Sequence, residues 1–210
     1  MAKHIPTQSE HIDPYAETPW HRTELDQDIH NCLQFFILEN KSRTTLKLEW
    51  ADKHAAFYEE YQHNEDYAFI YTDSSLLHTN GTCKAGYSVV AYRGNEEIAI
   101  ANGALGKGVE VYDTEMKVLE KAAKIVQWIT ADAEPPPPKN IIIATDNTGA
   151  IQWIFKGSPG LAQASSLKFR KWILEALDWD KDLKITVTWC PGHFDIEGNE
   201  RADTLAKFAP

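Results

Sequence analysis

Three short apolar runs in the middle of the chain predict consecutive strands. Residues 67–72, 85–92 and 97–102 are rich in aromatic and β-branched side chains, which favour extended backbone. The sequence Arg93-Gly94-Asn95 separates the second run from the third and is typical of a tight hairpin turn. These runs therefore predict a three-stranded antiparallel meander.

Downstream of the meander, helical and extended patterns alternate. Apolar residues recur at three- and four-residue intervals over residues 114–128, which predicts an amphipathic helix with Asp113 or Thr114 as its N-cap. After a connector of four prolines, the continuously apolar run 141–145 predicts a strand that is buried on both faces. Similar patterns predict one more strand at 184–189 and helices at 150–155, 167–179 and 199–208. The order predicts an α/β fold in which parallel crossover units follow the meander.

The first 66 residues have a different character. Prolines among polar residues over 1–20 predict an extended arm, and helical spacing predicts helices over 26–38 and 50–61. We therefore expect a partly helical N-terminal extension of unknown function at residues 1–66 and one domain at residues 67–210.

Composition narrows the class of protein. The 210 residues suffice for one well-buried core, and the three widely spaced cysteines provide neither a disulfide framework nor a paired metal site. No apolar run approaches the roughly 20 residues that cross a bilayer, and the N-terminus lacks the apolar stretch of a signal peptide. We expect an intracellular protein without a membrane partner.

Four acidic residues fall at positions where an α/β fold collects ligands. Asp73 and Asp146 each follow an apolar run, Glu115 lies in the first turn of a predicted helix, and Asp203 lies in the last helix. Each one alone has an ordinary structural role as a turn former, a helix-terminal residue or a solvated side chain. If the fold brings them together, their mutual repulsion requires a hard cation such as Mg²⁺ or Mn²⁺. A pair of such ions is suited to phosphoryl transfer.

The motifs around these residues resemble those of the ribonuclease H family. They are Tyr71-Thr-Asp-Ser-Ser75, Tyr112-Asp-Thr-Glu-Met116, Ala144-Thr-Asp-Asn147, and the block from Trp189 to Ala206, which holds Pro-Gly-His and Gly-Asn-Glu-Arg-Ala-Asp. The resemblance covers residues 67–208 in the family's order and looks closest to the ribonuclease H domains of fungal non-LTR retroelements. It implies a mixed five-stranded sheet, three antiparallel strands followed by parallel ones, that is flanked by helices and carries an extra N-terminal segment.

The resemblance also implies an activity and a set of site residues. The expected reaction is hydrolysis of the RNA strand of an RNA/DNA hybrid, giving 5′-phosphate and 3′-hydroxyl ends. The tetrad Asp73, Glu115, Asp146 and Asp203 would bind two Mg²⁺ ions, with Mn²⁺ as a substitute, and His193 would assist turnover. A reverse transcriptase domain of the same element is the implied protein partner.

The resemblance assigns substrate contacts less firmly than metal ligands. Ser74, at a position where the family often has glycine, and Asn147 are the expected contacts beside the tetrad. Asn80 and Gly81, near Lys84, are expected contacts that equally fit an ordinary turn. Two carboxylate alternatives also stand in the sequence: Asp113 competes with Glu115, and the pair Glu197 and Glu200 flanks the last motif.

The net charge of −10 does not exclude a nucleic-acid partner. Residues 1–66 hold 6 basic and 13 acidic residues, a balance of −7, which leaves −3 for residues 67–210. Setting aside the four proposed ligands changes this −3 to +1. Two other function classes stay open, namely a hybrid-binding module without cleavage and a metal-dependent DNA nuclease or integrase on the related fold.

Overall fold

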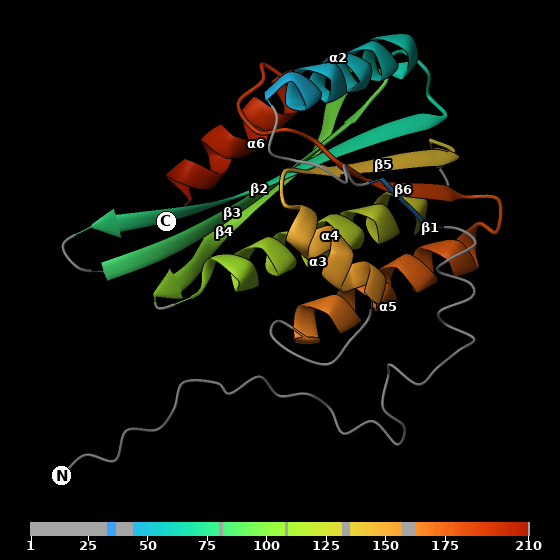
Figure 1. Cartoon of the computed structure of the whole chain (residues 1–210). Coiled ribbons are helices and arrows are strands. Elements are labelled where there is room, and N and C mark those ends of the chain that lie inside the picture. Colours follow the sequence, from blue (N-terminus) through green and yellow to red (C-terminus); the bar gives the residue numbers. More distant parts are fainter. Residues whose placement is uncertain are drawn as a thin grey trace, which may run out of the picture.

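A computed structural model describes residues 33–36, 44–79, 82–107, 109–131, 135–156 and 163–209 (Figure 1). The strands are β1 (Leu33–Phe36), β2 (Tyr67–Thr79), β3 (Thr82–Arg93), β4 (Glu96–Lys107), β5 (Asn140–Thr145) and β6 (Lys184–Trp189). The helices are α2 (Thr44–Tyr61), α3 (Val111–Ala131), α4 (Thr148–Lys156), α5 (Gln163–Trp179) and α6 (Glu197–Phe208).

The strands form one mixed sheet in the order β1-β6-β5-β2-β3-β4. Strands β2, β3 and β4 are antiparallel, whereas β5 pairs with β2, β6 with β5 and β1 with β6 in parallel. This topology confirms the predicted fold class, including its five-stranded mixed sheet. A sixth strand, β1, is added by the N-terminal segment.

The helix predicted over 26–38 is wrong for the part that the structure describes. Leu33–Phe36 is a strand that continues the sheet at the edge of β6. Helical spacing of apolar residues was the only signal there, and a free sheet edge supplies backbone hydrogen bonds that a sequence pattern does not reveal. The remainder of that helix and the extended arm predicted over 1–20 lie outside the described residues.

The two faces of the sheet bury different side chains. Helices α3, α4 and α5 cover one face, while α2 and α6 lie on the other (Figure 1). Because successive side chains of a strand point to opposite faces, Ile70 of β2 joins the core beneath α3 and α5, and Tyr71 joins the core beneath α2 and α6. Strand β2 therefore contributes to both cores.

Several elements are longer than their sequence patterns predict. Strand β2 continues to Thr79 because it pairs with β3 over its whole length, so Asp73 lies inside a strand and not after one. Helix α3 begins at Val111, which places Asp113 within its first turn. The prediction of Asp113 or Thr114 as N-cap is therefore wrong, since a cap residue precedes the first helical residue.

Helix α2 confirms and extends the helix predicted over 50–61. Ala51 is buried against the aromatic core of β2, and the Trp50 indole N–H donates a hydrogen bond to the carbonyl of Trp189, 2.6 Å away. The N-terminal segment thus contacts the sheet through both a strand and a helix. The division of the chain at residue 66 stays a prediction.

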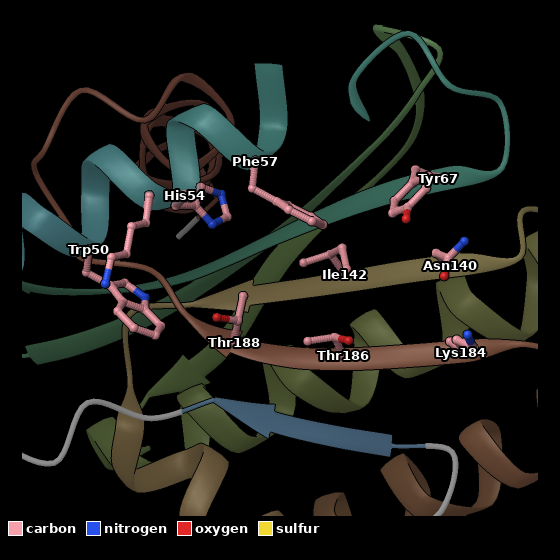
Figure 2. Close-up of a pocket in the computed structure, with 10 residues that line it drawn as sticks. Trp50, His54, Phe57, Tyr67, Asn140, Ile142, Lys184, Thr186 and Thr188 are labelled. Carbon is pink, nitrogen blue, oxygen red and sulfur yellow. The ribbon is translucent and has the colours of Figure 1, made fainter. Parts of the chain in front are cut away.

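A cavity of about 490 Å³ lies between α2 and strands β5 and β6 (Figure 2). Aromatic and aliphatic side chains from α2, β2 and β5 line it together with the hydroxyls of Thr186 and Thr188. None of the four predicted ligands is among its lining residues.

Within the described part of the chain, no helix is long and apolar enough to traverse a bilayer.

Candidate active site

Strand register brings Asp73 and Asp146 together. The parallel pairing of β2 with β5 ends at Thr72 opposite Thr145. Asp73 and Asp146 are the residues that directly follow these two in the sequence. Strand β5 stops there, whereas β2 continues along β3, and the chain after Asp146 turns into α4. The site therefore lies where a central strand ends within the sheet, as expected for a ligand site in an α/β fold.

Glu115 and Asp203 reach Asp73 from opposite layers. Glu115 lies in the first turns of α3, on one face of the sheet, and Asp203 lies in α6, on the other. Glu115, Asp146 and Asp203 all act electrostatically on the Asp73 carboxyl. The fold thus collects the four predicted ligands around Asp73, each from a different element.

A glycine lets α6 approach the sheet closely. A Cβ atom on Gly198 would lie 2.2 Å from the ring of Tyr71, far inside van der Waals contact. Only glycine leaves room for the first turn of α6 on the strand residue two positions before Asp73. This explains the glycine of the Gly-Asn-Glu-Arg-Ala-Asp block, since the close approach also sets Asp203 against Asp73.

Crowding of the carboxylates raises their proton affinities. Burial, the charge of Asp146 and a hydrogen bond with Asp203 raise the pKa of Asp73 to about 8. Burial and Asp146 raise the pKa of Glu115 to about 7, although the polar side chains of Ser74 and Asn147 act in the opposite direction. Loss of hydration also raises the pKa of Asp146, and the neighbouring His193 lowers it in part.

The two oxygens of Glu115 have different surroundings. Ser74 donates a hydrogen bond of 2.8 Å to Oε1. Oε2 is buried and makes no hydrogen bond in the described structure. A buried carboxylate oxygen without a donor is costly, so Oε2 is suited to a ligand from outside the chain.

His193 lies on a tight loop directly beside Asp146. A Cβ on Gly192 would come within 2.9 Å of Asp146 Oδ2, so the glycine lets the loop lie against Asp146 without displacing its carboxylate. The Trp189 indole N–H donates a 2.9 Å hydrogen bond to the Asp146 carbonyl, which ties the base of the loop to the end of β5. His193 itself is exposed and has a φ of 61°, an unusual conformation for a residue with a side chain.

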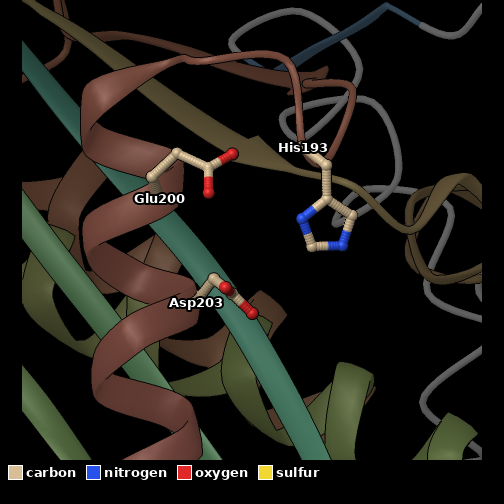
Figure 3. A group of neighbouring side chains, drawn as sticks. All are labelled: His193, Glu200 and Asp203. Atoms are coloured by element: carbon tan, nitrogen blue, oxygen red, sulfur yellow. The ribbon is translucent and has the colours of Figure 1, made fainter.

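A second acidic side chain belongs to the same region. Ligand atoms of His193, Glu200 and Asp203 all lie within 4.8 Å of one another (Figure 3). The sequence ranks Glu200 below the tetrad, but Glu200 and Asp203 are three residues apart on α6 and therefore share one face of the helix. That spacing is the signal that identifies Glu200 as a site residue.

The predicted substrate contacts have different structural outcomes. Ser74 is hydrogen-bonded to Glu115, and the Asn147 side chain accepts a 3.0 Å hydrogen bond from the Ala150 N–H at the start of α4. Asn80 and Gly81 lie outside the described residues. The structure thus gives Ser74 and Asn147 contacts within the protein, and their role toward substrate stays a prediction.

The donor set fits hard divalent cations. It consists of carboxylate oxygens, which Mg²⁺ and Mn²⁺ prefer, and burial together with the neighbouring carboxylates raises the pKa values of Asp73 and Glu115. Lys207 Nζ forms an ion pair of 2.5 Å with Asp203 Oδ2 and partly balances this negative charge. Among the described residues, Glu115 Oε2 makes no hydrogen bond of good geometry, although the nearby Asn147 side chain lowers the pKa of Glu115, so this buried oxygen is where further positive charge would be accepted.

Several solved structures are similar to this chain. Similar solved structures include the RNase H1 of the halophilic archaeon Halobacterium salinarum NRC-1, which is 18% identical with a TM-score of 0.44 over 68% of this chain and 96% of that chain. The N-terminal RNase H domain of Rv2228c from Mycobacterium tuberculosis is 18% identical with a TM-score of 0.46, over 68% of this chain and 98% of that chain. LC11-RNase H1 in complex with an RNA/DNA hybrid is 17% identical with a TM-score of 0.49, over 68% of this chain and 95% of that chain.

The family assignment rests on a sequence comparison. No significant match was found among curated proteins. The family model for RNase H, however, matches residues 64–209, which is well over half of the 210-residue chain. The chain therefore belongs to the RNase H family and is a hydrolase of the ribonuclease H type.

Proposed function

We propose that this ribonuclease H hydrolyses the RNA strand of RNA/DNA hybrids with two divalent metal ions, giving 5′-phosphate and 3′-hydroxyl ends. One observation carries the proposal: four carboxylates from four elements meet at the end of β5, and Glu115 presents a buried oxygen without a partner. Carboxylate repulsion of this kind is compensated when cations bind. The donor set favours Mg²⁺, with Mn²⁺ as a substitute.

The four carboxylates would hold the ions, with Asp73 shared because it lies among the other three. When bound, divalent ions supply an activated water and stabilise the charge that develops on the phosphate and on the leaving 3′-oxygen. The chain contributes fixed ligand positions, since α3, α6, β2 and β5 are all anchored in the core. Glu200 lies close enough to Asp203 and His193 to extend the ligand set.

His193 is placed for proton exchange at the edge of the site. Its side chain is exposed on a loop whose glycine touches Asp146, so it reaches solvent and the ligand set together. Imidazole exchanges protons near neutral pH, which suits protonation of the leaving 3′-oxygen and release of product.

Hybrid recognition would rely on shape and phosphate contacts. The wide minor groove of an A-like duplex presents 2′-hydroxyls, for which Asn80, Gly81 and Asn147 are the proposed contacts. The downstream charge balance of −3 includes the four ligand carboxylates, so ions bound at the site would remove the repulsion of phosphates. The proposed context is intracellular, in a fungal non-LTR retroelement with a reverse transcriptase domain as partner.

Asp146→Asn tests the proposal. The full chain is incubated with labelled RNA/DNA hybrid, duplex DNA and duplex RNA, in Mg²⁺ and in EDTA. We expect metal-dependent loss of only the RNA strand of the hybrid, reduced about 10³-fold in Asp146→Asn because one ligand carboxylate supplies several kcal/mol. Asp113→Asn, which changes a carboxylate outside the tetrad, is the matched control and keeps activity.

The same assay separates the alternative functions. Equal cleavage of duplex DNA would indicate the DNA nuclease, and binding without cleavage in Mg²⁺ would indicate the hybrid-binding module. Either result, or an active Asp146→Asn enzyme, overturns the proposal. A separate His193→Ala variant should cleave slowly in steady state and retain measurable cleavage, whereas an unchanged steady-state rate would remove His193 from the reaction.

A further inference from the structure

We propose that Ser74 is a positioning residue, whose hydroxyl holds Glu115 so that the second carboxylate oxygen is presented to a divalent ion. The inference rests on the proposed function and adds a residue to the metal-binding arrangement. Ser74 Oγ lies 2.8 Å from Glu115 Oε1, while Glu115 Oε2 is buried and has no hydrogen bond of good geometry to any described residue. One oxygen is thus committed to the protein and the other is left for a ligand.

Strand geometry makes this contact possible. Consecutive residues of β2 point to opposite faces of the sheet, so Asp73 faces the α6 side and Ser74 faces the α3 side. This agrees with the partners of each side chain, Asp203 of α6 for Asp73 and Glu115 of α3 for Ser74. Two adjacent residues therefore connect both helix layers to the site.

A count of hydroxyl protons fixes the direction of the hydrogen bond. Thr114 Oγ1 donates its only proton to the carbonyl of Val111. Ser74 Oγ lies 3.2 Å from Thr114 Oγ1, which can then only accept. The single Ser74 proton is directed mainly at Glu115 Oε1, since an ionised carboxylate is the stronger acceptor and the distance is shorter.

The contact distinguishes this chain from the family pattern, in which glycine often stands where this chain has Ser74. Glycine offers no side-chain donor, so the hydrogen bond depends on Ser74 itself. Groups that orient metal ligands in this way typically change metal affinity or activity by about 10- to 100-fold when they are removed. A substrate contact, in contrast, would change binding of the hybrid.

The primary measurement is Mn²⁺ binding to the full chain, monitored by the electron paramagnetic resonance signal of the free ion. We expect Ser74→Ala and Ser74→Gly to weaken Mn²⁺ binding about tenfold and Ser74→Thr, which keeps the hydroxyl, to restore it. Ser165→Ala is the matched control, because Ser165 donates a 3.0 Å hydrogen bond to the buried Glu120 outside the site. Thermal unfolding shows whether each variant is folded.

Cleavage assays separate positioning from substrate contact. For Ser74→Ala, the Mg²⁺ concentration for half-maximal cleavage should rise about tenfold while KM for the hybrid is unchanged. Unchanged Mn²⁺ binding in Ser74→Ala, failure of Ser74→Thr to restore it, or equal weakening in Ser165→Ala would overturn the proposal. If the wild-type protein binds Mn²⁺ but does not cleave hybrid, the proposed function fails, and the Mn²⁺ titrations still decide the role of Ser74.

Discussion

Tyr71 and Asp73 lie two residues apart on the same face of β2, yet their surroundings differ completely. The Tyr71 hydroxyl lies 3.1 Å from Nε2 of the buried His54 in α2, and the two groups share a hydrogen bond. Asp73 instead faces three carboxylates. The first environment is a closed neutral pair, whereas the second has an excess of negative charge that no group among the described residues fully balances.

This difference separates structural from functional burial of polar groups. Burial lowers the pKa of His54 to about 4, so the ring stays neutral and its contact with Tyr71 is satisfied within the protein. Burial and like charges raise the pKa of Asp73 to about 8, so ionisation there needs a partner from outside. One strand thus stabilises the fold and holds the site.

The largest expected effect comes from removing the charge at Asp73. Asp73→Asn should lower hybrid cleavage about 10³-fold, since a ligand carboxylate is lost. Without metal, the same variant should unfold at a higher temperature than wild type, with a larger gain at pH 9 than at pH 6. Asp73 ionises near pH 3.8 in the unfolded chain and only near pH 8 in the folded state, so wild-type stability falls as the pH rises between these values and the full loss is present at pH 9. A lower melting temperature at pH 9 would contradict this.

Acid should weaken the His54 contact by a smaller but measurable amount. The folded-state pKa of about 4 lies below the ordinary histidine pKa of 6.5, so the unfolded chain takes up a proton first as the pH falls. The stabilising contribution is complete above pH 6.5 and is lost toward pH 4, by roughly 3 kcal/mol. Denaturant unfolding of wild type and His54→Gln between pH 4 and 7 measures it, and parallel pH profiles would refute it.

A side chain added at Gly198, where α6 contacts Tyr71, should affect the surroundings of both Tyr71 and Asp73. Gly198→Ala places a Cβ 2.2 Å from a ring carbon of Tyr71, so α6 must shift, at a cost of roughly 2 kcal/mol. Cleavage should fall as well because Asp203 moves with α6. Ala209→Gly, after the same helix, serves as a control. An unchanged melting temperature in Gly198→Ala would show that the close approach is not required.

The smallest expected effect concerns the contact of α2 with the base of the His193 loop. Trp50→Phe keeps an aromatic ring and removes the hydrogen bond to the Trp189 carbonyl, which should lower stability by about 1 kcal/mol.

Tyr71→Phe removes the hydrogen bond with His54, which should also lower stability by about 1 kcal/mol and leave cleavage unchanged. Chemical unfolding and hybrid cleavage test both variants, and loss of cleavage in Tyr71→Phe would break the separation between the two environments.

Local patterns predicted much of the site, although they did not predict how its residues contact one another. The strand at 184–189 is confirmed residue for residue, and the motif around Asp203 lies on the predicted helix. The sequence predicts that Asp73 follows a strand, because Ser74 and Ser75 interrupt the apolar run. Pairing with β3 nevertheless extends the strand past these two serines. Polar residues in a strand are stabilised by partners that the local sequence does not contain.

The sequence by itself determined the alternation of strands and helices and the elements that carry each acidic residue, because hydrophobic periodicity and motif spacing are local properties. Only the tertiary structure decided that Ser74 holds Glu115, that Glu200 joins His193, and that Leu33–Phe36 extends the sheet. Each of these depends on groups that are distant in sequence or on adjacent helical turns whose side-chain direction is set by packing. Register and layer geometry, which arise from the whole fold, fix those contacts.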